Sequence, residues 1–437
     1  MLRATALRRT GRTRLALLLL GMAVCPGSAS SNAQGGDAGP VGLTIKVPVD
    51  HADPSLGYGT LYCELGALFD RMKPTVFVIA DGQQFYVRKG AIADLQQKLF
   101  GPGMNVVGIV GRGFSDDIMQ ATVSDPSRPD WTLAWRVLSS RQWVEDIEDV
   151  RKHLHLPHGF LMLYGTSGGA YLTSEYLTVH GAEVRRAAVL SPPVRPIDRS
   201  LGINHDHFWK DLGAQAAELQ RKLHAALEAH ADRRPFIIRL LQRQNFFHTP
   251  DALPRERAML VDEFARWDEA ALARRDEQYQ VSAIDELLES PTGPAIRVRI
   301  YEFVQPVLAG LDLFGDTVYP NIENEYHIAR PLLEAWREGR IPAPSMDLGA
   351  LNRLGTEMLV VAGRWDHTAD YRAAISLASR FRNGLLVLAD DNHQLARMEA
   401  AGVLQPLVRA FLLHGPASPE THQALEQAGE YRWSERE

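Results

Sequence analysis

Short apolar segments alternate with helical segments along most of this chain, and no other feature constrains its fold as strongly. The apolar segments are rich in β-branched residues and end in turn signals, and the segments between them have helical periodicity. Strands that are apolar on both faces belong in a parallel sheet covered by helices on both sides. The strand-like runs are TVFVIADG, NVVGIVG, FLMLYG and RRAAVLSPP, and typical helical runs are SSRQWVEDIEDVRKHLHL and GGAYLTSEYLTVHG.

The remaining segments predict how this α/β core is divided. LTIKVPV and GTLYCELGAL flank a turn-rich stretch and predict an antiparallel hairpin, while MLVVAG and LLVLAD predict two late strands. Between the strand RRAAVLSPP and the late strand MLVVAG, the sequence is almost entirely helical. We therefore expect a core over residues 34–193, a helical cap insertion over 194–349, a second part of the core over 350–415, and a polar, loosely attached tail over 416–437.

Residues 1–33 have the pattern of a signal peptide. An arginine-rich start precedes the apolar run LALLLLGMAVC and a group of small residues. The sequence thus predicts export to the periplasm or beyond, with no stable membrane insertion after cleavage. A membrane anchor, lipidation at Cys25 and a twin-arginine signal at Arg8 and Arg9 are the alternatives.

Composition excludes some functions. The net charge of −6 is mild and charges of both signs are mixed, so nucleic acid is not an expected partner. Once the signal is removed, Cys63 is the only cysteine, and we expect it to be a buried, unpaired side chain. His205 and His207 in NHDHF lack a third metal ligand at convincing spacing, so we predict neither a metal nor an organic cofactor.

FLMLYGTSGGAYL contains the strongest candidate for a reactive side chain. Gly165-Thr166-Ser167-Gly168-Gly169 lies between an apolar strand and a helix, the setting of a nucleophile elbow. Glycines allow so tight a turn, and Ser167 would project above the sheet. The backbone N–H of Gly168 would then point to a developing oxyanion, with a second donor at Gly82 or Gln83 after the strand TVFVIA.

A serine hydroxyl needs a base, and two late loops supply candidates. Asp366 follows the strand MLVVAG and His393 follows LLVLAD, so both would reach the same sheet edge as Ser167, in the order acid then histidine. Four other residues compete for these two roles: His367, Asp370, Asp390 and Asp391.

These motifs resemble the α/β-hydrolase superfamily, and within it the proline iminopeptidase-like and tripeptidyl-aminopeptidase-like serine exopeptidases. VPVDHADP resembles their opening strand, GTSGG their elbow, and GRWDHTADY with ADDNHQ their acid and histidine loops. The resemblance covers roughly Leu43 to Gly415 without the insertion, which falls where that family has its lid.

Two departures limit what this resemblance implies. Gly108 and Val110 replace the acidic and basic residues of the family's D-x-R-G-x-G-x-S stretch, and A-D-G-Q-Q replaces H-G-G-P-G. The fold and the triad of Ser167, His393 and Asp366 carry over, but specificity for proline does not. An exopeptidase lid needs carboxylates to hold a substrate ammonium group, and Glu302, Glu323 and Glu325 are the candidates, although such residues are more often solvated.

The sequence therefore predicts a serine hydrolase that cleaves an amide or ester bond through an acyl-enzyme. The family resemblance favours an exopeptidase acting on short peptides. A carboxylesterase with the same triad is the first alternative, and a non-catalytic binding protein of the same fold is the second.

Overall fold

The computed structural model describes residues 40–434, apart from 81–86, 88–89, 124, 126–127 and 204–206. The predicted signal peptide lies outside the described residues, as do Gly82, Gln83 and His205. Across these described ranges, no helix combines the length and the apolar character needed to cross a bilayer.

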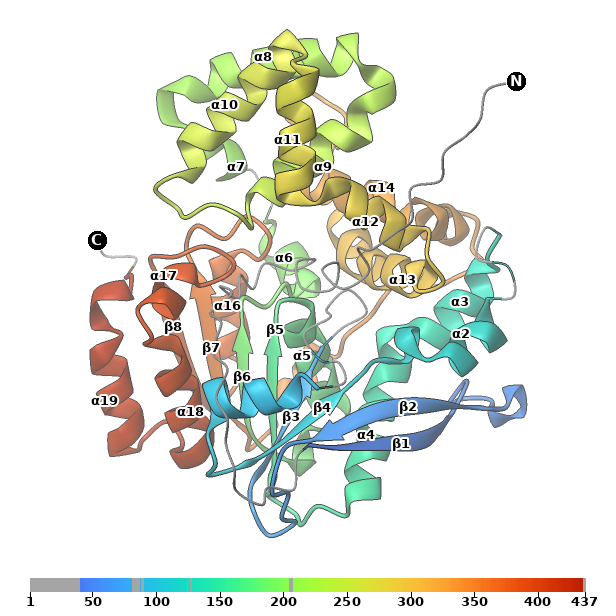
Figure 1. Ribbon diagram of the computed structural model, residues 1–437, viewed down its shortest axis with the longest axis vertical. Helices are drawn as coiled ribbons and strands as arrows, with labels where there is room; N and C mark the ends of the chain where they lie inside the picture. Colours follow the sequence, from blue (N-terminus) through green and yellow to red (C-terminus); the bar gives the residue numbers. More distant parts are fainter. Residues whose placement is uncertain are drawn as a thin grey trace, which may run out of the picture.

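A single eight-stranded sheet forms the centre of the molecule (Figure 1), in the order β1-β2-β4-β3-β5-β6-β7-β8. The predicted hairpin pairs antiparallel, β2 also pairs antiparallel with β4, and all other neighbours are parallel. This arrangement is that of the α/β-hydrolase fold, so the predicted fold class is confirmed. The strands are β1 (Val41–Pro48), β2 (Tyr58–Leu65), β3 (Thr75–Ile79), β4 (Asn105–Ile109), β5 (Leu161–Thr166), β6 (Val184–Leu190), β7 (Glu357–Gly363) and β8 (Asn383–Ala389).

Helices cover both faces of the sheet because the parallel strands are apolar on both sides. On one face, α4, α5 and α16 contribute to a large hydrophobic cluster, and on the other α1, α17, α18 and α19 contribute to a second one. These core helices, with α2 and α3 before α4, are α1 (Ile92–Leu95, continued by a π-helical turn over Gln96–Phe100), α2 (Asp116–Thr122), α3 (Trp131–Leu138), α4 (Ser140–Leu154), α5 (Gly168–His180), α16 (Tyr371–Ala378), α17 (Ala396–Ala400), α18 (Leu404–His414) and α19 (Pro419–Gln427).

The described part of the chain between β6 and β7 consists of helices joined by loops, without a strand, and lies above the carboxyl ends of the parallel strands (Figure 1). Its elements are α6 (Arg195–Leu201), α7 (His207–Lys210), α8 (Ala216–Ala229), α9 (Arg234–Gln244), α10 (Leu253–Arg266), α11 (Glu269–Tyr279), α12 (Val281–Leu288), α13 (Gly293–Val304), α14 (Pro320–Arg337) and α15 (Leu348–Leu351). We refer to α6–α15 as the cap.

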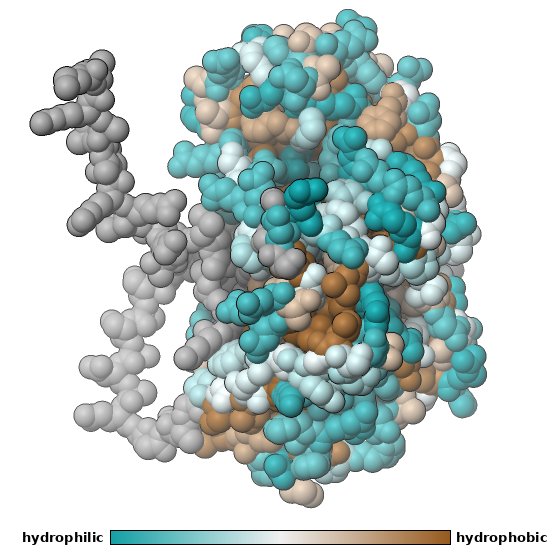
Figure 2. All heavy atoms as spheres, turned by 90° about the vertical axis from the view of Figure 1, so that its right-hand side faces the viewer, coloured by the Kyte–Doolittle hydropathy of each residue, from teal (hydrophilic) through white to brown (hydrophobic). Residues whose placement is uncertain are grey.

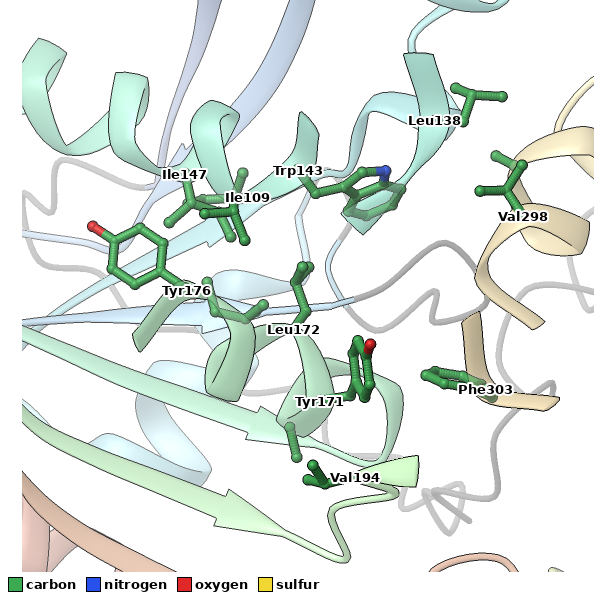
Figure 3. Close-up of a cluster of buried hydrophobic side chains, with 14 of the residues drawn as sticks. Ile109, Leu138, Trp143, Ile147, Tyr171, Leu172, Tyr176, Val194, Val298 and Phe303 are labelled. Carbon is green, nitrogen blue, oxygen red and sulfur yellow. The ribbon is translucent and has the colours of Figure 1, made fainter. Parts of the chain in front are cut away.

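The cap consists of two layers. Its outer helices α8–α11 enclose a hydrophobic cluster of their own, whereas α13 and α14 belong to the same cluster as the core helices. Tyr171 of α5 meets Phe303 of α13 edge-on at 5.3 Å, and Val298 faces the end of α3 (Figure 3). The inner cap layer is thus part of the core.

On the face in Figure 2, hydrophilic side chains cover most of the surface and hydrophobic ones gather near the middle.

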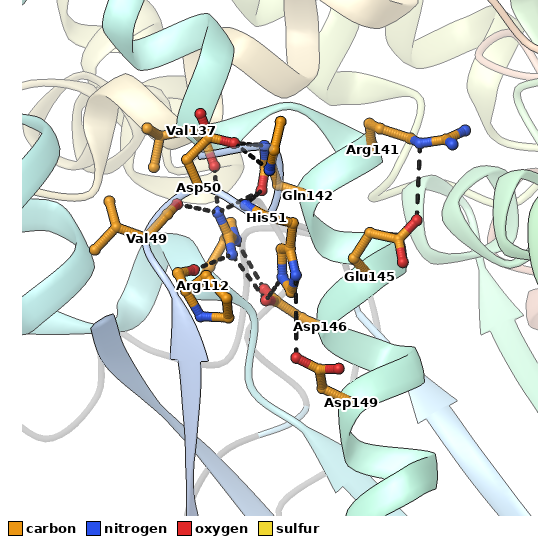
Figure 4. Close-up of polar contacts among 12 residues, drawn as sticks. Val49, Asp50, His51, Arg112, Val137, Arg141, Gln142, Glu145, Asp146 and Asp149 are labelled. Atoms are coloured by element: carbon orange, nitrogen blue, oxygen red, sulfur yellow. Dashed lines mark hydrogen bonds and ion pairs between the residues drawn. The ribbon is translucent and has the colours of Figure 1, made fainter. Parts of the chain in front are cut away.

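A fully buried arginine ties the hairpin to the helices behind it (Figure 4). Arg112 donates from Nε and Nη2 to the two carboxylate oxygens of Asp146, at 2.7 and 2.8 Å, and from Nη1 to the carbonyls of Val49 and Val137. His51 lies 2.8 Å from the same carboxylate. The D-x-R-G-x-G-x-S pattern has its arginine at position 110, where this chain has Val110, and accepts any residue at position 112. In this chain the arginine of this stretch is at position 112.

The C-terminal residues differ from the prediction of a loosely attached tail. They form α19, and its Thr421 and Ala424 are buried, as is Ala428 just after it. The chain then runs along the sheet edge, where the Trp433 N–H donates to the Leu388 carbonyl at 2.8 Å. The prediction was wrong because β8 is an edge strand whose outer backbone groups need hydrogen-bond partners. The tail supplies backbone partners at this edge, and its small apolar side chains contact α18.

Cys63 is fully buried and unpaired, as predicted. Burial, together with the nearby Asp146 carboxylate, raises the pKa of its thiol to about 12. A thiol with such a pKa is not a nucleophile at neutral pH, so Cys63 is a packing residue.

We expect Arg112→Met to lower the free energy of unfolding by about 3–5 kcal/mol, because it leaves the buried Asp146 carboxylate without its guanidinium. Urea denaturation followed by circular dichroism measures this change. Arg141→Met is the matched control, since Arg141 is exposed and lies 3.8 Å from Glu145, and it should cost less than about 1 kcal/mol. Equal costs for the two variants would contradict the assignment.

Candidate active site

Ser167 occupies a strained turn between β5 and α5. Its backbone has φ 50° and ψ −122°, a conformation that non-glycine residues rarely adopt. Gly165 makes the turn possible, because a Cβ there would lie 2.4 Å from the Gly169 carbonyl oxygen. The Ser167 N–H donates to the Leu190 carbonyl at 2.8 Å, so β6 holds the turn in place. The local geometry is that of the predicted nucleophile elbow.

The structure brings Ser167, His393 and Asp366 together in a chain of hydrogen bonds. His393 Nε2 lies 2.9 Å from Ser167 Oγ, and His393 Nδ1 lies 2.7 Å from Asp366 Oδ2. All three residues are less than 9% exposed. An imidazole between a hydroxyl and a carboxylate can accept the hydroxyl proton on one nitrogen while the carboxylate holds the other nitrogen protonated.

The backbone holds the Asp366 carboxylate in place. Its Oδ1 accepts the N–H groups of Thr368 and Ala369, at 2.7 and 2.8 Å, which leaves Oδ2 for His393. Two bonds to one oxygen orient the whole group, so Asp366 is fixed before any substrate arrives.

The four competing residues have other contacts. His367 lies 2.9 Å from Asp211 of the cap, and Asp370 caps α16 and pairs with Arg372. Asp390 pairs with Arg364 and Arg397, and Asp391 accepts N–H groups from the loop that carries His393 and from the first turn of α17. Burial raises the pKa of the Asp391 carboxyl, and the three backbone N–H bonds act in the opposite direction. Asp391 therefore shapes the loop, and only Asp366 among these acids is hydrogen-bonded to His393.

One of the predicted oxyanion donors can be placed. Gly168 is the first residue of α5, so its N–H is among the helix N-terminal groups that have no partner within the helix. The positive end of the α5 dipole lies at the same point. Gly82 and Gln83, the candidates for the second donor, lie outside the described residues.

A cavity of about 80 Å³ opens beside Ser167 between the core and the cap. Apolar side chains predominate in its wall, among them Leu287 of α12, Ile300 of α13 and Ile328 of α14. Two charged side chains, Arg243 of α9 and Glu325 of α14, also line it. A small and largely apolar substrate group with a few polar contacts matches such a wall.

The three predicted substrate carboxylates separate in the structure. Glu302 Oε1 accepts the N–H and Oγ–H of Ser140 at 2.8 and 2.7 Å, and Arg299 pairs with its other oxygen. Arg234 binds both oxygens of the fully buried Glu323. Neither residue is among those that line the cavity beside Ser167. Arg299, one turn earlier on α13, neutralises Glu302, and Arg234 of α9 neutralises Glu323.

Glu325 does line the cavity. Its Oε1 accepts from Arg195 Nη2 at 2.9 Å and from Asn321 Nδ2 at 3.0 Å. Its Oε2 is buried and has no hydrogen-bond partner among the described residues. A buried carboxylate oxygen without a donor is costly, and a ligand that donates a hydrogen bond would relieve that cost.

Sequence reasoning missed two cap residues at this site. The Phe246 ring meets the His393 imidazole edge-on, with 5.4 Å between ring centres, and Arg243 lies one turn earlier in the chain. LQRQNFF contains no chemical motif, and its helical pattern does not indicate which face meets the core. Within the described residues, no group of three or more His, Cys, Asp or Glu side chains is arranged to bind a metal.

No protein-family profile and no curated protein matches this sequence. Among solved structures, the chain is similar to MGS-M2, an α/β hydrolase enzyme from a Medee basin deep-sea metagenome library, with 11% identity, a TM-score of 0.42, and coverage of 82% of this chain and 96% of that one. It is similar to the esterase EaEST from Exiguobacterium antarcticum at 12% identity and a TM-score of 0.42, covering 81% and 96%. An α/β fold family hydrolase from Bacillus anthracis str. Sterne has 13% identity and a TM-score of 0.41, covering 84% and 99%. Likenesses this distant carry no information about activity.

We expect Asp366→Asn to slow modification of Ser167 by a fluorophosphonate probe by roughly 10⁴-fold, because an amide in this place favours the wrong histidine tautomer. The labelling rate, followed by gel fluorescence, measures the effect. Asp370→Asn is the matched control, since this neighbouring acid caps α16, and it should change the rate less than about threefold. If both variants were labelled at the wild-type rate, Asp366 would not be the acid.

Proposed function

We propose that this protein is a serine hydrolase that cleaves an amide or ester bond through an acyl-enzyme. One observation carries the proposal: the Ser167 hydroxyl, on a strained turn beside a cavity, lies 2.9 Å from an imidazole whose other nitrogen meets a buried carboxylate. A structural serine needs none of these features, whereas an activated nucleophile needs all of them.

In the proposed first step, Ser167 Oγ attacks the substrate carbonyl while His393 Nε2 takes its proton. Asp366 stabilises the imidazolium that forms. Negative charge develops on the carbonyl oxygen, where the Gly168 N–H and the N-terminus of α5 stabilise it. His393 then gives its proton to the leaving amine or alcohol, the carbonyl carbon to leaving-group bond breaks, and the acyl group stays on Ser167.

The second step repeats this chemistry with water. His393 takes a proton from the water, its oxygen attacks the acyl carbon, and Ser167 leaves with the proton that His393 returns. The product is a free acid, and the enzyme is restored. A cavity of about 80 Å³ favours a small acyl group.

The favoured substrate is a short peptide cleaved near its amino end. Glu325 supports this choice, because it lines a cavity formed largely by apolar side chains and its buried Oε2, which has no partner among the described residues, would accept a hydrogen bond from an α-ammonium group. Arg195 already pairs with the other oxygen of Glu325, so the carboxylate keeps its orientation with or without a ligand.

A carboxylesterase is the second candidate. The apolar wall of Leu287, Ile300 and Ile328 would accept the acyl chain of an ester, and ester hydrolysis needs only the same three residues and the oxyanion donors. The proposal also includes export, which rests on the sequence pattern of residues 1–33.

Labelling of the purified protein with a fluorophosphonate, followed by mass spectrometry, tests the proposed chemistry. We expect a single modified residue, Ser167, because its hydroxyl lies 2.9 Å from Nε2 of the His393 imidazole. Ser167→Ala should lose all labelling. Ser191→Ala is the matched control and should keep it, since the Ser191 hydroxyl donates to the backbone carbonyl of His393 and not to its imidazole. Absence of labelling in a folded protein would overturn the proposal in favour of the non-catalytic one.

Hydrolysis of aminoacyl arylamides, compared with short acyl esters, separates the two candidates. For an exopeptidase, Glu325→Gln should raise KM for the arylamide by about 10-fold to 100-fold and leave KM for the acetyl ester unchanged. The reason is that only the arylamide has an ammonium group. Turnover of esters alone would make the protein a carboxylesterase.

A further inference from the structure

The cavity beside Ser167 has walls of different chemistry, because several cap helices each present one face to it. The residues that α12 and α13 contribute are all apolar, and they recur at the spacing of one helix face. The residues that α9 and α14 contribute are mostly polar. The cavity therefore has an apolar side and a polar side. Its apolar side consists of Ile284, Leu287, Leu288, Ile296, Ile300 and Phe303.

The lining of the cavity indicates which part of a substrate it would hold. In a serine hydrolase the acyl group stays bonded to the serine, whereas the leaving group departs next to the histidine that protonates it. Ser167 lines the cavity, but His393 is not among the described residues that do so. Phe246 lines it as well, and its ring meets the His393 imidazole edge-on, with 5.4 Å between ring centres. An aromatic ring and not the imidazole borders the cavity there, which matches the acyl part of a substrate.

The volume of the cavity limits the size of that acyl group. A dry apolar cavity of about 150 Å³ binds one benzene molecule, which has six carbon atoms. By proportion, a cavity of about 80 Å³ holds roughly three or four carbon atoms. Butanoyl has three carbon atoms beyond its carbonyl carbon, acetyl has one and octanoyl has seven. Butanoyl therefore fills the cavity best.

Helix α12 supplies the part of the wall that is least fixed by packing. Ile284 and Leu287 are only half-buried, whereas the neighbouring Leu288 is buried in the core cluster. Asp285 and Glu286 are exposed, so the helix presents an apolar face to the cavity and a charged face to solvent. An acyl group in the cavity would bury the apolar surface that Ile284 and Leu287 leave uncovered.

We propose that this cavity is an acyl pocket that selects short aliphatic acyl groups, with about three or four non-hydrogen atoms beyond the carbonyl carbon, and that α12 sets the limit. This inference rests on the proposed hydrolase function and names its substrate class. It applies to both candidate substrates. Butanoyl is the matching group of an ester, and alanyl is the matching group of a peptide, in which the α-nitrogen takes one of the places.

Hydrolysis of p-nitrophenyl esters by the wild-type protein tests the acyl length, because the leaving group stays the same. Burial of one CH₂ group is worth roughly fourfold, so kcat/KM for the butanoate should exceed that for the acetate by about 10-fold. The octanoate overfills the cavity and should fall at least about 10-fold below the butanoate. Among aminoacyl p-nitroanilides, the alanyl compound should exceed the leucyl one for the same reason.

Variants of Leu287 test the role of α12. Leu287→Ala removes three carbon atoms from the wall, so the preferred ester should become the hexanoate. Leu287→Phe adds bulk to the same place and should make the acetate the preferred ester. Leu348→Ala is the matched control, because Leu348 is another half-buried leucine that packs against the core cluster but does not line this cavity. The control should still prefer the butanoate.

Fluorophosphonate labelling of Ser167 separates failure of this inference from failure of the hydrolase function. For a labelled protein, equal or faster turnover of the octanoate, turnover of none of these substrates, or an unchanged preference in both folded Leu287 variants would overturn the inference alone. The same holds if lengthening the alcohol of a butanoate ester changed kcat/KM more than lengthening the acyl group. Absence of both labelling and turnover would overturn the hydrolase function as well. The wild-type profile needs no variant, so misfolding of a Leu287 variant would leave the test intact.

Discussion

The parallel pairing of β5, β6, β7 and β8 is the constraint on which the rest of this structure depends. The ladder continues past the strand ends, since the N–H groups of Ser167, Ser191 and Arg364 donate to carbonyls of the neighbouring strands at 2.8–2.9 Å. The loops after β5, β7 and β8 therefore leave the sheet at the same edge. Ser167 and His393 are 226 residues apart in the sequence, and this shared edge brings them into hydrogen-bond distance.

The cap completes the site because its inner layer is part of the core. The α13 and α14 side chains pack into the cluster that also contains α4 and α5, so this wall of the cavity is continuous with the core. Charged groups inside this layer are paired, as for Glu302 with Arg299 and Glu323 with Arg234. Buried charges must be neutralised, and Glu325, which lines the cavity, pairs with Arg195 through Oε1 while its Oε2 has no hydrogen-bond partner among the described residues.

Predictions from the sequence succeeded where the signal lies in neighbouring residues and failed where the outcome depends on how segments distant in the sequence pack on one another. The alternation of apolar and helical segments predicted the sheet, and the glycines around Ser167 predicted the turn, because both follow from backbone geometry and hydrophobic period. The tail after Pro416 looked loose because its polar composition hides the two alanines and the edge strand that hold it. The buried arginine at position 112 was also missed, since the family pattern directs attention to position 110.

The sequence by itself determined the α/β class, the helical segment before the last two strands, the tight turn at Ser167 and the positions of Asp366 and His393 after late strands. Each of these is written in contiguous residues, whose periodicity and turn chemistry act over a few positions. Only the tertiary structure decided that Glu325 and not Glu302 or Glu323 lines the cavity, and that Arg243 and Phe246 lie beside His393. The cap helices present several polar residues each, and which of them faces the site depends on how helices distant in sequence pack on one another.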